Sequence, residues 1–254
     1  LEVEIPVIIG GKEIRTGDIG RVRMPHNHNH VLATFHRAGP KEAEMAVKAA
    51  IEAHRQWSSM AWTIRASILL KAAELIATKY RHTVNAATML GQSKTIHQSE
   101  IDAVCEVIDF LKYNVSYAGE IYETQPKSKY NQLNRMEYRA LEGFVLAVSP
   151  FNFTSIASNL NMAPVMMGNT TLWKPASTAL LSNYYLMKIY MEAGVPPGVI
   201  NFLPGKGPAI GDTVVKSPHL AGLHFTGSNS TFNHLWSEVT KNLTTYKSYP
   251  RLVG

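Results

Sequence analysis

The segment Gly143-Phe-Val-Leu-Ala-Val-Ser-Pro-Phe-Asn-Phe-Thr154 decides the fold. Its first six residues carry no charge and no polar side chain, which is typical of a strand buried on both faces of a sheet. Ser149-Pro150 ends the strand, and a helical pattern begins at Thr154 after a short turn. A strand that passes through a short turn into a helix is the first part of a β-α unit, and it predicts a parallel sheet.

The same rhythm continues to the end of the chain. The strands after the first are expected at Asn169–Trp173, Val199–Leu203 and Ala221–Phe225. Helices are expected at Thr154–Met167, Thr178–Ala193 and Ser230–Asn242, and a short helix that ends at about Lys216 is expected after the strand at Val199–Leu203. Four β-α units joined by short connections imply right-handed crossovers. The sequence therefore predicts an α/β fold with a doubly wound, Rossmann-like parallel sheet covered by helices on both faces.

The first half of the chain has a different pattern. Residues 1–40 predict short extended pieces with turns, as at Ile9-Gly-Gly-Lys12, and helical periodicity follows. Three helices are expected, at Lys41–Trp57, Thr63–Tyr80 and Ser93–Tyr117, and the third has its apolar face at Ile96, Ile101, Val104, Cys105, Ile108 and Leu111. Pro126–Arg139 is polar and unpatterned, which indicates a linker or an extended arm. We divide the chain into an N-terminal region (1–125), an arm (126–142) and an incomplete dinucleotide-binding domain (143–254).

Composition narrows the class of protein. Hydrophobic residues make up 45% of the 254 and charged residues 17%, which is typical of a folded domain. No apolar run approaches the ~20 residues of a membrane helix, and a single cysteine excludes a disulfide framework. The net charge of +6 is spread along the chain, so we expect neither a nucleic-acid nor a membrane partner. No initiator methionine or targeting segment opens the chain, and Tyr249–Gly254 resembles the middle of an element, so we expect both ends to be cut.

Ligands of an open parallel sheet bind beyond the carboxyl ends of its strands. Those ends are Ser149–Thr154, Lys174–Ser177, Pro204–Pro208 and Thr226–Thr231, and each combines glycine or proline with a hydroxyl, amide or amine. The turn before the last helix fits a pyrophosphate group, because a helix N-terminus offers free N–H groups. No G-x-G-x-x-G follows the first strand. Spacing alone leaves two readings open, a nucleotide site and ordinary α/β turns.

Several motifs resemble the aldehyde dehydrogenase superfamily in order and spacing. The four that carry the resemblance are Ser149-Pro-Phe-Asn-Phe-Thr154, Leu172-Trp-Lys-Pro175, Gly194-Val-Pro-Pro-Gly198 and Phe225-Thr-Gly-Ser228. Finer features resemble the Δ1-pyrroline-5-carboxylate (glutamate-γ-semialdehyde) dehydrogenases of mitochondria: Met89-Leu-Gly-Gln-Ser-Lys-Thr95, Glu100-Ile-Asp102, Ile108-Asp-Phe110, Leu141-Glu-Gly-Phe144 and Thr231-Phe-Asn-His-Leu-Trp236. The resemblance covers residues from about Pro6 to Gly254.

The resemblance implies NAD-dependent oxidation of L-glutamate γ-semialdehyde to glutamate in proline catabolism. Asn152 matches the asparagine that stabilises the developing oxyanion, while Phe153 and Glu100 are assigned to the substrate. The alternatives are that Asn152 is an ordinary turn residue and that Glu100 is a solvated acid on a helix. The residues assigned to the cofactor are Ser149, Lys174, Ser177, Gly227, Ser228, Asn229, Ser230 and Thr231. Ser177 stands where many NAD-preferring members carry glutamate, which leaves NAD against NADP open.

The sequence offers no good candidate for a catalytic nucleophile. Cys105 is the only cysteine, and it lies among apolar helix positions where a free cysteine is usually a packing residue. The resemblance places the catalytic cysteine and the general-base glutamate beyond residue 254, so we expect these 254 residues alone to be inactive. Two alternatives remain open: a dehydrogenase for another aldehyde, and a non-catalytic nucleotide-binding or interaction subunit.

Further expectations concern metal, location and assembly. His26, His28 and His30 alternate as a metal site would need, but flanking Pro25 favours a surface loop, so no metal is expected. The resemblance implies a mitochondrial matrix protein that forms a homo-oligomer and acts on a small molecule. It also places residues 126–142 in a dimerising flap.

Overall fold

The computed structural model describes residues 3–254 and contains two sheets. The larger has seven strands in the order β10-β9-β6-β7-β8-β2-β3. Its five adjacent parallel strands are β6 (Phe144–Val148), β7 (Thr170–Lys174), β8 (Ile200–Phe202), β9 (Leu220–Phe225) and β10 (Arg251–Val253). The predicted parallel sheet is confirmed, and β10 adds a strand that the sequence pattern did not indicate.

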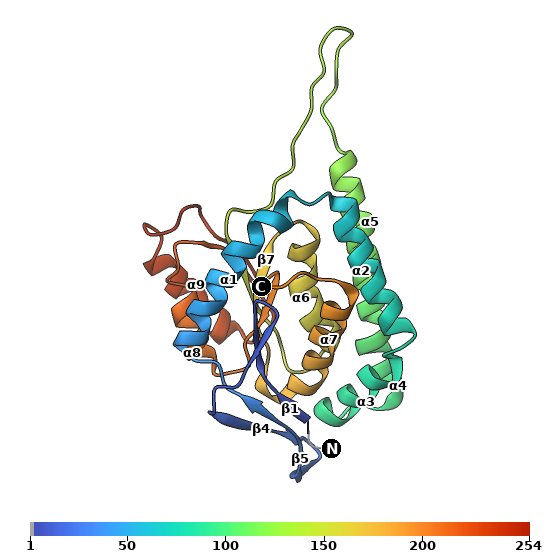
Figure 1. Cartoon of the computed structure of the whole chain (residues 1–254), viewed down its shortest axis with the longest axis vertical. Helices are drawn as coiled ribbons and strands as arrows, with labels where there is room; N and C mark the ends of the chain where they lie inside the picture. The colour runs from blue at the N-terminus through green and yellow to red at the C-terminus, as the bar shows by residue number, and fades with distance from the viewer. Residues whose placement is uncertain (1–2) are drawn as a thin grey trace.

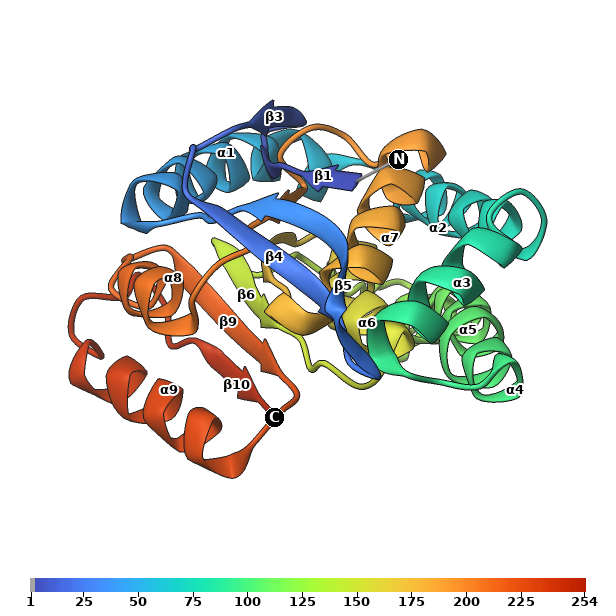
Figure 2. The ribbon, with the colours of Figure 1, turned by 90° about the horizontal axis from the view of Figure 1, so that it is seen from below.

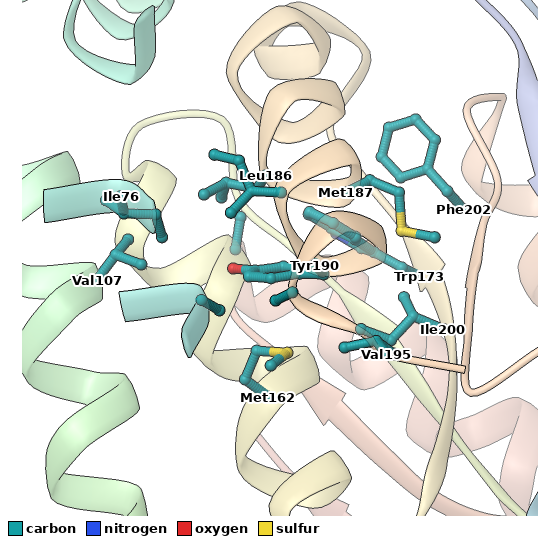
Figure 3. Packing of buried hydrophobic residues seen from close by; sticks show 14 of the residues in the cluster. Ile76, Val107, Met162, Trp173, Leu186, Met187, Tyr190, Val195, Ile200 and Phe202 are labelled. Carbon is teal, nitrogen blue, oxygen red and sulfur yellow. The ribbon is translucent and has the colours of Figure 1, made fainter. Parts of the chain in front are cut away.

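Helices cover both faces of this sheet, as predicted (Figures 1 and 2). The crossover helices are α6 (Thr154–Met166), α7 (Leu180–Ala193) with a preceding 3-10 turn at Ser177–Ala179, and α8 (Gly207–Val214), while α9 (Asn229–Lys241) follows β9. Alternate side chains of β7 point to opposite cores, since Trp173 packs toward α6 and α7 whereas Leu172 packs toward α8 and α9. Figure 3 shows Trp173 close to Met187, Tyr190 and Phe202.

The N-terminal strands belong to both sheets. A hairpin of β2 (Val7–Ile9) and β3 (Lys12–Ile14) extends the large sheet, with β2 antiparallel to β8. Gly10 and Gly11 form its turn at φ values of 58° and 75°, which favour glycine. The smaller sheet consists of β1 (Val3–Ile5), β5 (Asn27–His36) and β4 (Ile19–Met24) in that order. The short extended pieces that the sequence predicts are therefore present.

The helical region differs from the three helices expected. It contains α1 (Pro40–Ser59), α2 (Trp62–Ala77), α3 (Arg81–Gln92), α4 (Ile96–Ser99), a π-helical segment at Glu100–Cys105, and α5 (Glu106–Glu123). The sequence missed α3 because its buried face includes Asn85, Thr88 and Gly91, which hide the apolar period. The helix expected at Ser93–Tyr117 is present as an unbroken helical stretch from Ile96 to Glu123, but its part from Glu100 to Cys105 is π-helical, which the sequence did not predict.

The π-helical segment also changes which residues face the core. A π turn takes an extra residue, so the apolar stripe of an α-helix does not continue through it. Ile96 is 61% exposed and Ile101 50% exposed, although both were expected on the apolar face. Val104 and Leu111, further along the same stretch, are buried as expected.

Residues 124–142 leave α5, project away from the body and return to β6 (Figure 1). An isolated bridge between Lys129 and Gln132 closes the tip, and Tyr130 and Leu133 are largely exposed there. This is the extended arm that the sequence predicts. Its place in a dimerising flap stays a prediction.

Candidate functional site

The order of the strands places two polar loops side by side. From β6 the chain moves outward through β7 and β8, and then crosses back so that β9 lies on the other side of β6. Ser149 N donates to Lys174 O at 3.2 Å, and Thr226 N donates to Val148 O at 3.2 Å, so the loops after β6 and β9 start at the same edge. Such a reversal in strand order is where doubly wound sheets bind ligands.

A cleft of about 380 Å³ opens at this edge between α8 and α9. It brings together three of the residues that the sequence assigns to a cofactor, Lys174, Ser230 and Thr231. The other lining residues are Leu146, Val148, Gly207, Pro208, Gly211, Asp212, His234 and Leu235. The cleft is thus largely apolar, with a few polar groups at its walls.

The N-terminus of α9 forms the polar wall of the cleft. Ser228 is the N-cap, and its Oγ accepts from Thr231 N at 3.4 Å. The N–H groups of Asn229 and Ser230 have no partner within the helix, because the first turn of a helix lacks preceding carbonyls. Together with the positive end of the helix dipole, these groups favour an anion.

Lys174 supplies the one ammonium among the described side chains that line this cleft. It ends β7, and burial lowers the pKa of its ammonium group. Opposite, His234 Nε2 lies 3.4 Å from Asp212 Oδ1 across the two helices. A cation that is costly to bury and has no carboxylate partner within residues 3–254 is typical of a binding residue rather than a stabilising one.

Gly227 is required by packing at the entrance to α9. A Cβ placed there would approach the Phe225 ring to 2.7 Å. Phe225 is stacked on Phe232, with 5.3 Å between ring centroids. A larger residue would therefore push the α9 N-terminus away from the cleft.

The loop after β6 carries Asn152 and Phe153. The side chain of Asn152 is exposed, and residues 3–254 offer its amide no hydrogen-bond partner. Phe153 is half-buried, and its ring centroid lies 3.8 Å from Lys94 Nζ. Ser149, at the start of the loop, is buried and accepts a hydrogen bond from Trp173 Nε1 at 3.0 Å. Asn152 is therefore free to bind a ligand while its loop is held.

Ser177 lies apart from the residues in the α8–α9 cleft. It lines a neighbouring hollow of about 800 Å³ together with Arg21, Arg23, Arg37 and Lys206. No carboxylate is among the side chains that line this hollow. The assignment of Ser177 to the cofactor stays a prediction.

The carboxylate of Glu100 is engaged by other side chains of the protein. It forms an ion pair with Arg81 and accepts from Asn85 Nδ2 at 2.6 Å. The hydrogen bond from Asn85 holds the pKa of Glu100 below its ordinary value, and Arg81 adds to this effect. Glu106 lies closer to the loop after β6, because its carboxylate accepts from Ser155 Oγ at the start of α6. A role for Glu100 in substrate binding stays a prediction.

Cys105 has none of the features of an activated nucleophile. Burial raises the pKa of its thiol, and the nearby charge of Glu100 raises it further. Arg81 lies 3.9 Å from the sulfur, but its charge is shared with Glu100. The thiol is therefore protonated at neutral pH.

The three histidines lie on a hairpin and not in the surface loop that was expected. His28 and His30 belong to β5, His26 lies in the turn before it, and all three are exposed. His26 Nδ1 lies 2.8 Å from Ser93 Oγ. Within residues 3–254, no three His, Cys, Asp or Glu side chains are grouped as a metal site requires. None of the helices described there is long and apolar enough to cross a bilayer.

Sequence reasoning found Ser230 and Thr231 of the cleft, but it gave no role to the other lining residues on α8 and α9. Gly207 and Pro208 follow a strand end that was singled out as a ligand position, but no role was given to them. His234 and Leu235 belong to the Thr231–Trp236 motif, but no role in a site was given to them. Spacing shows which residues share a helix face, but it does not show which other helix that face meets.

Known proteins share this architecture. The model of the "Aldehyde dehydrogenase family" matches residues 15–248. The mitochondrial delta-1-pyrroline-5-carboxylate dehydrogenase of Dictyostelium discoideum is 50% identical over 255 residues, covering 99% of this chain and 46% of the relative. The human mitochondrial enzyme of that name is 46% identical, covering 98% of this chain and 44% of the relative. A structure of the Mycobacterium tuberculosis delta-pyrroline-5-carboxylate dehydrogenase bound with NAD has 48% identity and a TM-score of 0.98, and the match covers 100% of this chain and 48% of that one. The chain thus spans about half the length of these relatives.

Proposed function

Since the chain belongs to the aldehyde dehydrogenase family, we propose that it forms the cofactor-binding part of an enzyme that oxidises L-glutamate γ-semialdehyde (Δ1-pyrroline-5-carboxylate) to glutamate with NAD. The observation that carries the proposal is the identity of about one half with delta-1-pyrroline-5-carboxylate dehydrogenases over nearly every residue of this chain. The matched residues include the α8–α9 cleft and the loop after β6.

The α8–α9 cleft is the proposed site for NAD. Leu146, Val148 and Leu235 offer apolar surface for an adenine ring, and the ammonium of Lys174 is the group proposed to donate to ribose hydroxyls. The free N–H groups at the start of α9 suit the pyrophosphate. When bound, NAD supplies the acceptor for the hydride that the aldehyde carbon loses.

Asn152 is proposed to stabilise negative charge on the aldehyde oxygen. Its amide is a neutral donor at the carboxyl end of β6, and its loop is tied to β7 through Ser149 and Trp173. A positioned donor of this kind contributes about 10²–10³ in rate. Cys105 is not expected to attack the aldehyde, because its thiol is protonated, so residues 1–254 alone should not turn over.

Glu106 is a better candidate than Glu100 for the ammonium group of the substrate. Among the residues the structure describes, its carboxylate bonds only to a neutral hydroxyl, that of Ser155, whereas Arg81 already neutralises Glu100. A charged amino group would therefore gain more from Glu106. The acidic group that faces the substrate is then supplied by the helical region, at the first turn of α5.

The test is NADH formation by the protein as expressed from its own gene, whose intact mass is measured first. A mass well above the 28.1 kDa of residues 1–254 would show that the chain continues. We expect oxidation of glutamate semialdehyde to be faster than that of propionaldehyde, and Asn152→Ala to lower kcat by about 10²–10³. Asn131→Ala, at the tip of the arm, is the matched control. A preference for the simple aldehyde, or no NADH from either, would refute the proposal.

The oligomeric state and the cellular location of the enzyme are part of the same proposal. We expect a homo-oligomer in the mitochondrial matrix, as the names of several relatives suggest for the organelle. The exposed Tyr130 and Leu133 at the tip of the arm offer apolar surface to a second copy. Light scattering on the protein with and without residues 127–137 tests this assembly.

A further inference from the structure

Thr154 follows the Asn152 loop directly and lies in a buried network of side-chain hydrogen bonds. It is the first residue of α6 and is fully buried. Its Oγ1 lies 3.0 Å from Thr88 Oγ1, 2.8 Å from Gln92 Nε2 and 3.0 Å from Ser182 Oγ. Residues of α3 and α7 thus meet at one hydroxyl group, two positions after Asn152.

The donors of this network can all be used in one direction, although Gln92 Oε1 is buried and has no partner among the described residues. Ser182 donates to Ala179 O at 3.2 Å, so its oxygen is available to accept from Thr154. The hydroxyl hydrogen of Thr154 is donated to Ser182, so the Thr154 oxygen accepts from Thr88 and Gln92. Gln92 also donates to Ser182 Oγ at 3.3 Å. A buried network whose donors are all used holds its members in a single arrangement.

A second contact comes from the same turn of the chain. Ser93 has a left-handed backbone, at φ 54°, so Gln92 and Lys94 on either side of it both reach the end of the loop. Lys94 Nζ lies 3.8 Å from the centroid of the Phe153 ring. The side chain is only 12% exposed, and Asp102 Oδ2 lies 2.5 Å from its nitrogen. The ammonium is therefore held over the ring, where a cation is attracted to the aromatic face.

We propose that Gln92, Lys94 and Thr154 are positioning residues that fix the direction of the Asn152 amide. The inference rests on the proposed function, because the role of Asn152 does. Asn152 has no side-chain hydrogen bond within residues 3–254, so the backbone on either side determines where its amide points. A misplacement of about 1 Å in a catalytic group can cost 10² in rate. The Gln-Ser-Lys motif thereby has a function that the cofactor site does not explain.

Thr154→Val tests the proposal, because it keeps the shape of the side chain and removes the hydroxyl. Thr154→Ser, which keeps the hydroxyl, is the matched control. In the protein expressed from its own gene, we expect Thr154→Val to lower kcat about tenfold with little change in the Kd for NAD, and Thr154→Ser to restore most of the rate. In an Asn152→Ala background, Thr154→Val should have almost no further effect on kcat. Equal effects of Thr154→Val in both backgrounds would overturn the proposal, because a merely structural role is additive.

A second measurement does not depend on turnover. Hydrogen exchange in a peptide covering residues 149–157 should be faster in Thr154→Val than in Thr154→Ser, while peptides from β9 and α9 remain unchanged. Unchanged exchange in that peptide would overturn the proposal even if the protein is inactive. An active wild type with a slow Asn152→Ala but a normal Thr154→Val would overturn the positioning role alone. If the wild type oxidises neither aldehyde but the exchange difference is present, the proposed function is refuted. The role of Thr154 in holding the Asn152 loop would still be established.

Discussion

Arg65 is a buried cation whose loss should destabilise the protein strongly. It lies on α2 with 3% of its surface exposed, and none of the carboxylates described in the structure pairs with it. Its guanidinium instead donates to the carbonyls of Trp57, Met60 and Met166 and to the hydroxyl of Tyr122. These carbonyls lie at the C-terminal ends of α1 and α6, where the helix dipoles are negative. Burial lowers the pKa of the guanidinium, which nevertheless stays charged at neutral pH.

Arg65→Met keeps much of the apolar volume and removes every donor. Each buried acceptor left without a partner costs about 1–3 kcal/mol, and the Arg65→Met variant leaves the carbonyls of Met60 and Met166 unpaired, whereas Trp57 O keeps its bond from Met60 N. Relief from burying a charge offsets part of this cost. A net loss of roughly 3 kcal/mol is expected, which corresponds to a fall in Tm of roughly 6–12 °C for a chain of this size. Arg65→Lys keeps the charge but not the planar guanidinium, so the stability of this variant should lie between those of the wild type and Arg65→Met.

Thermal unfolding followed by circular dichroism is the assay, with Arg55→Met as the matched control. Arg55 lies on α1, is exposed and makes none of the described hydrogen bonds, so its replacement should stay within about 0.5 kcal/mol of the wild type. The reasoning would be refuted by an Arg65→Met protein as stable as Arg55→Met. That result would mean that the cost of burying the charge already equals all that its hydrogen bonds contribute.

Lys174→Met should weaken NAD binding about tenfold or more without lowering stability, because it removes a half-buried cation that pairs with no carboxylate within residues 3–254. Calorimetric titration beside Lys216→Met, at an exposed position, checks this. Burial lowers the pKa of Lys174. The affinity of the wild type for NAD should therefore begin to fall at a lower pH than the titration of an exposed lysine would predict. An affinity that stays constant to strongly alkaline pH would contradict this. Gly143→Ala should cost at least about 1 kcal/mol, since φ there is 133° and a Cβ would lie 2.0 Å from His219 O; Gly207→Ala, whose Cβ meets nothing within 4 Å, should change the unfolding midpoint little.

The sheet could be predicted because its strands are short apolar runs that end in glycine, proline or hydroxyl residues. The helices of the first half were harder, because their buried faces are not apolar throughout. On α3 the core accepts Asn85 and Thr88, whose hydrogen bonds exist only once α6 and the Glu100 turn are in place. A π-helical segment likewise arises from tertiary packing, and the exposure of Ile101 could not be derived from an α-helical period.

The candidate site could be predicted as far as its strand ends and not beyond. Rules for parallel sheets and the motifs together named Asn152, Lys174 and the start of α9, and the structure brings Lys174 and α9 to one cleft. Ser177 and Glu100 were assigned by resemblance, and both assignments stay predictions, since Ser177 lines a neighbouring hollow and Glu100 pairs with Arg81. What a side chain faces across the molecule depends on helix packing, which a linear sequence does not display.

Helix α6 connects the helical region to the chemistry proposed for Asn152. Its C-terminal carbonyl at Met166 is bound by Arg65 of α2, and its first residue, Thr154, is bound by Gln92 of α3. Between these ends, α5 contributes Glu106 to Ser155 and Asn114 to Asn159, the latter pair at 2.8 Å. A helix fixed at both ends and along one side cannot slide without breaking several buried hydrogen bonds. The Asn152 loop is the direct N-terminal extension of that helix, so α2, α3 and α5 determine where the amide lies relative to the cleft. Substitutions in these helices far from the cleft should therefore affect kcat more than the affinity for NAD, since the residues proposed to bind NAD lie on β6, β7, α8 and α9.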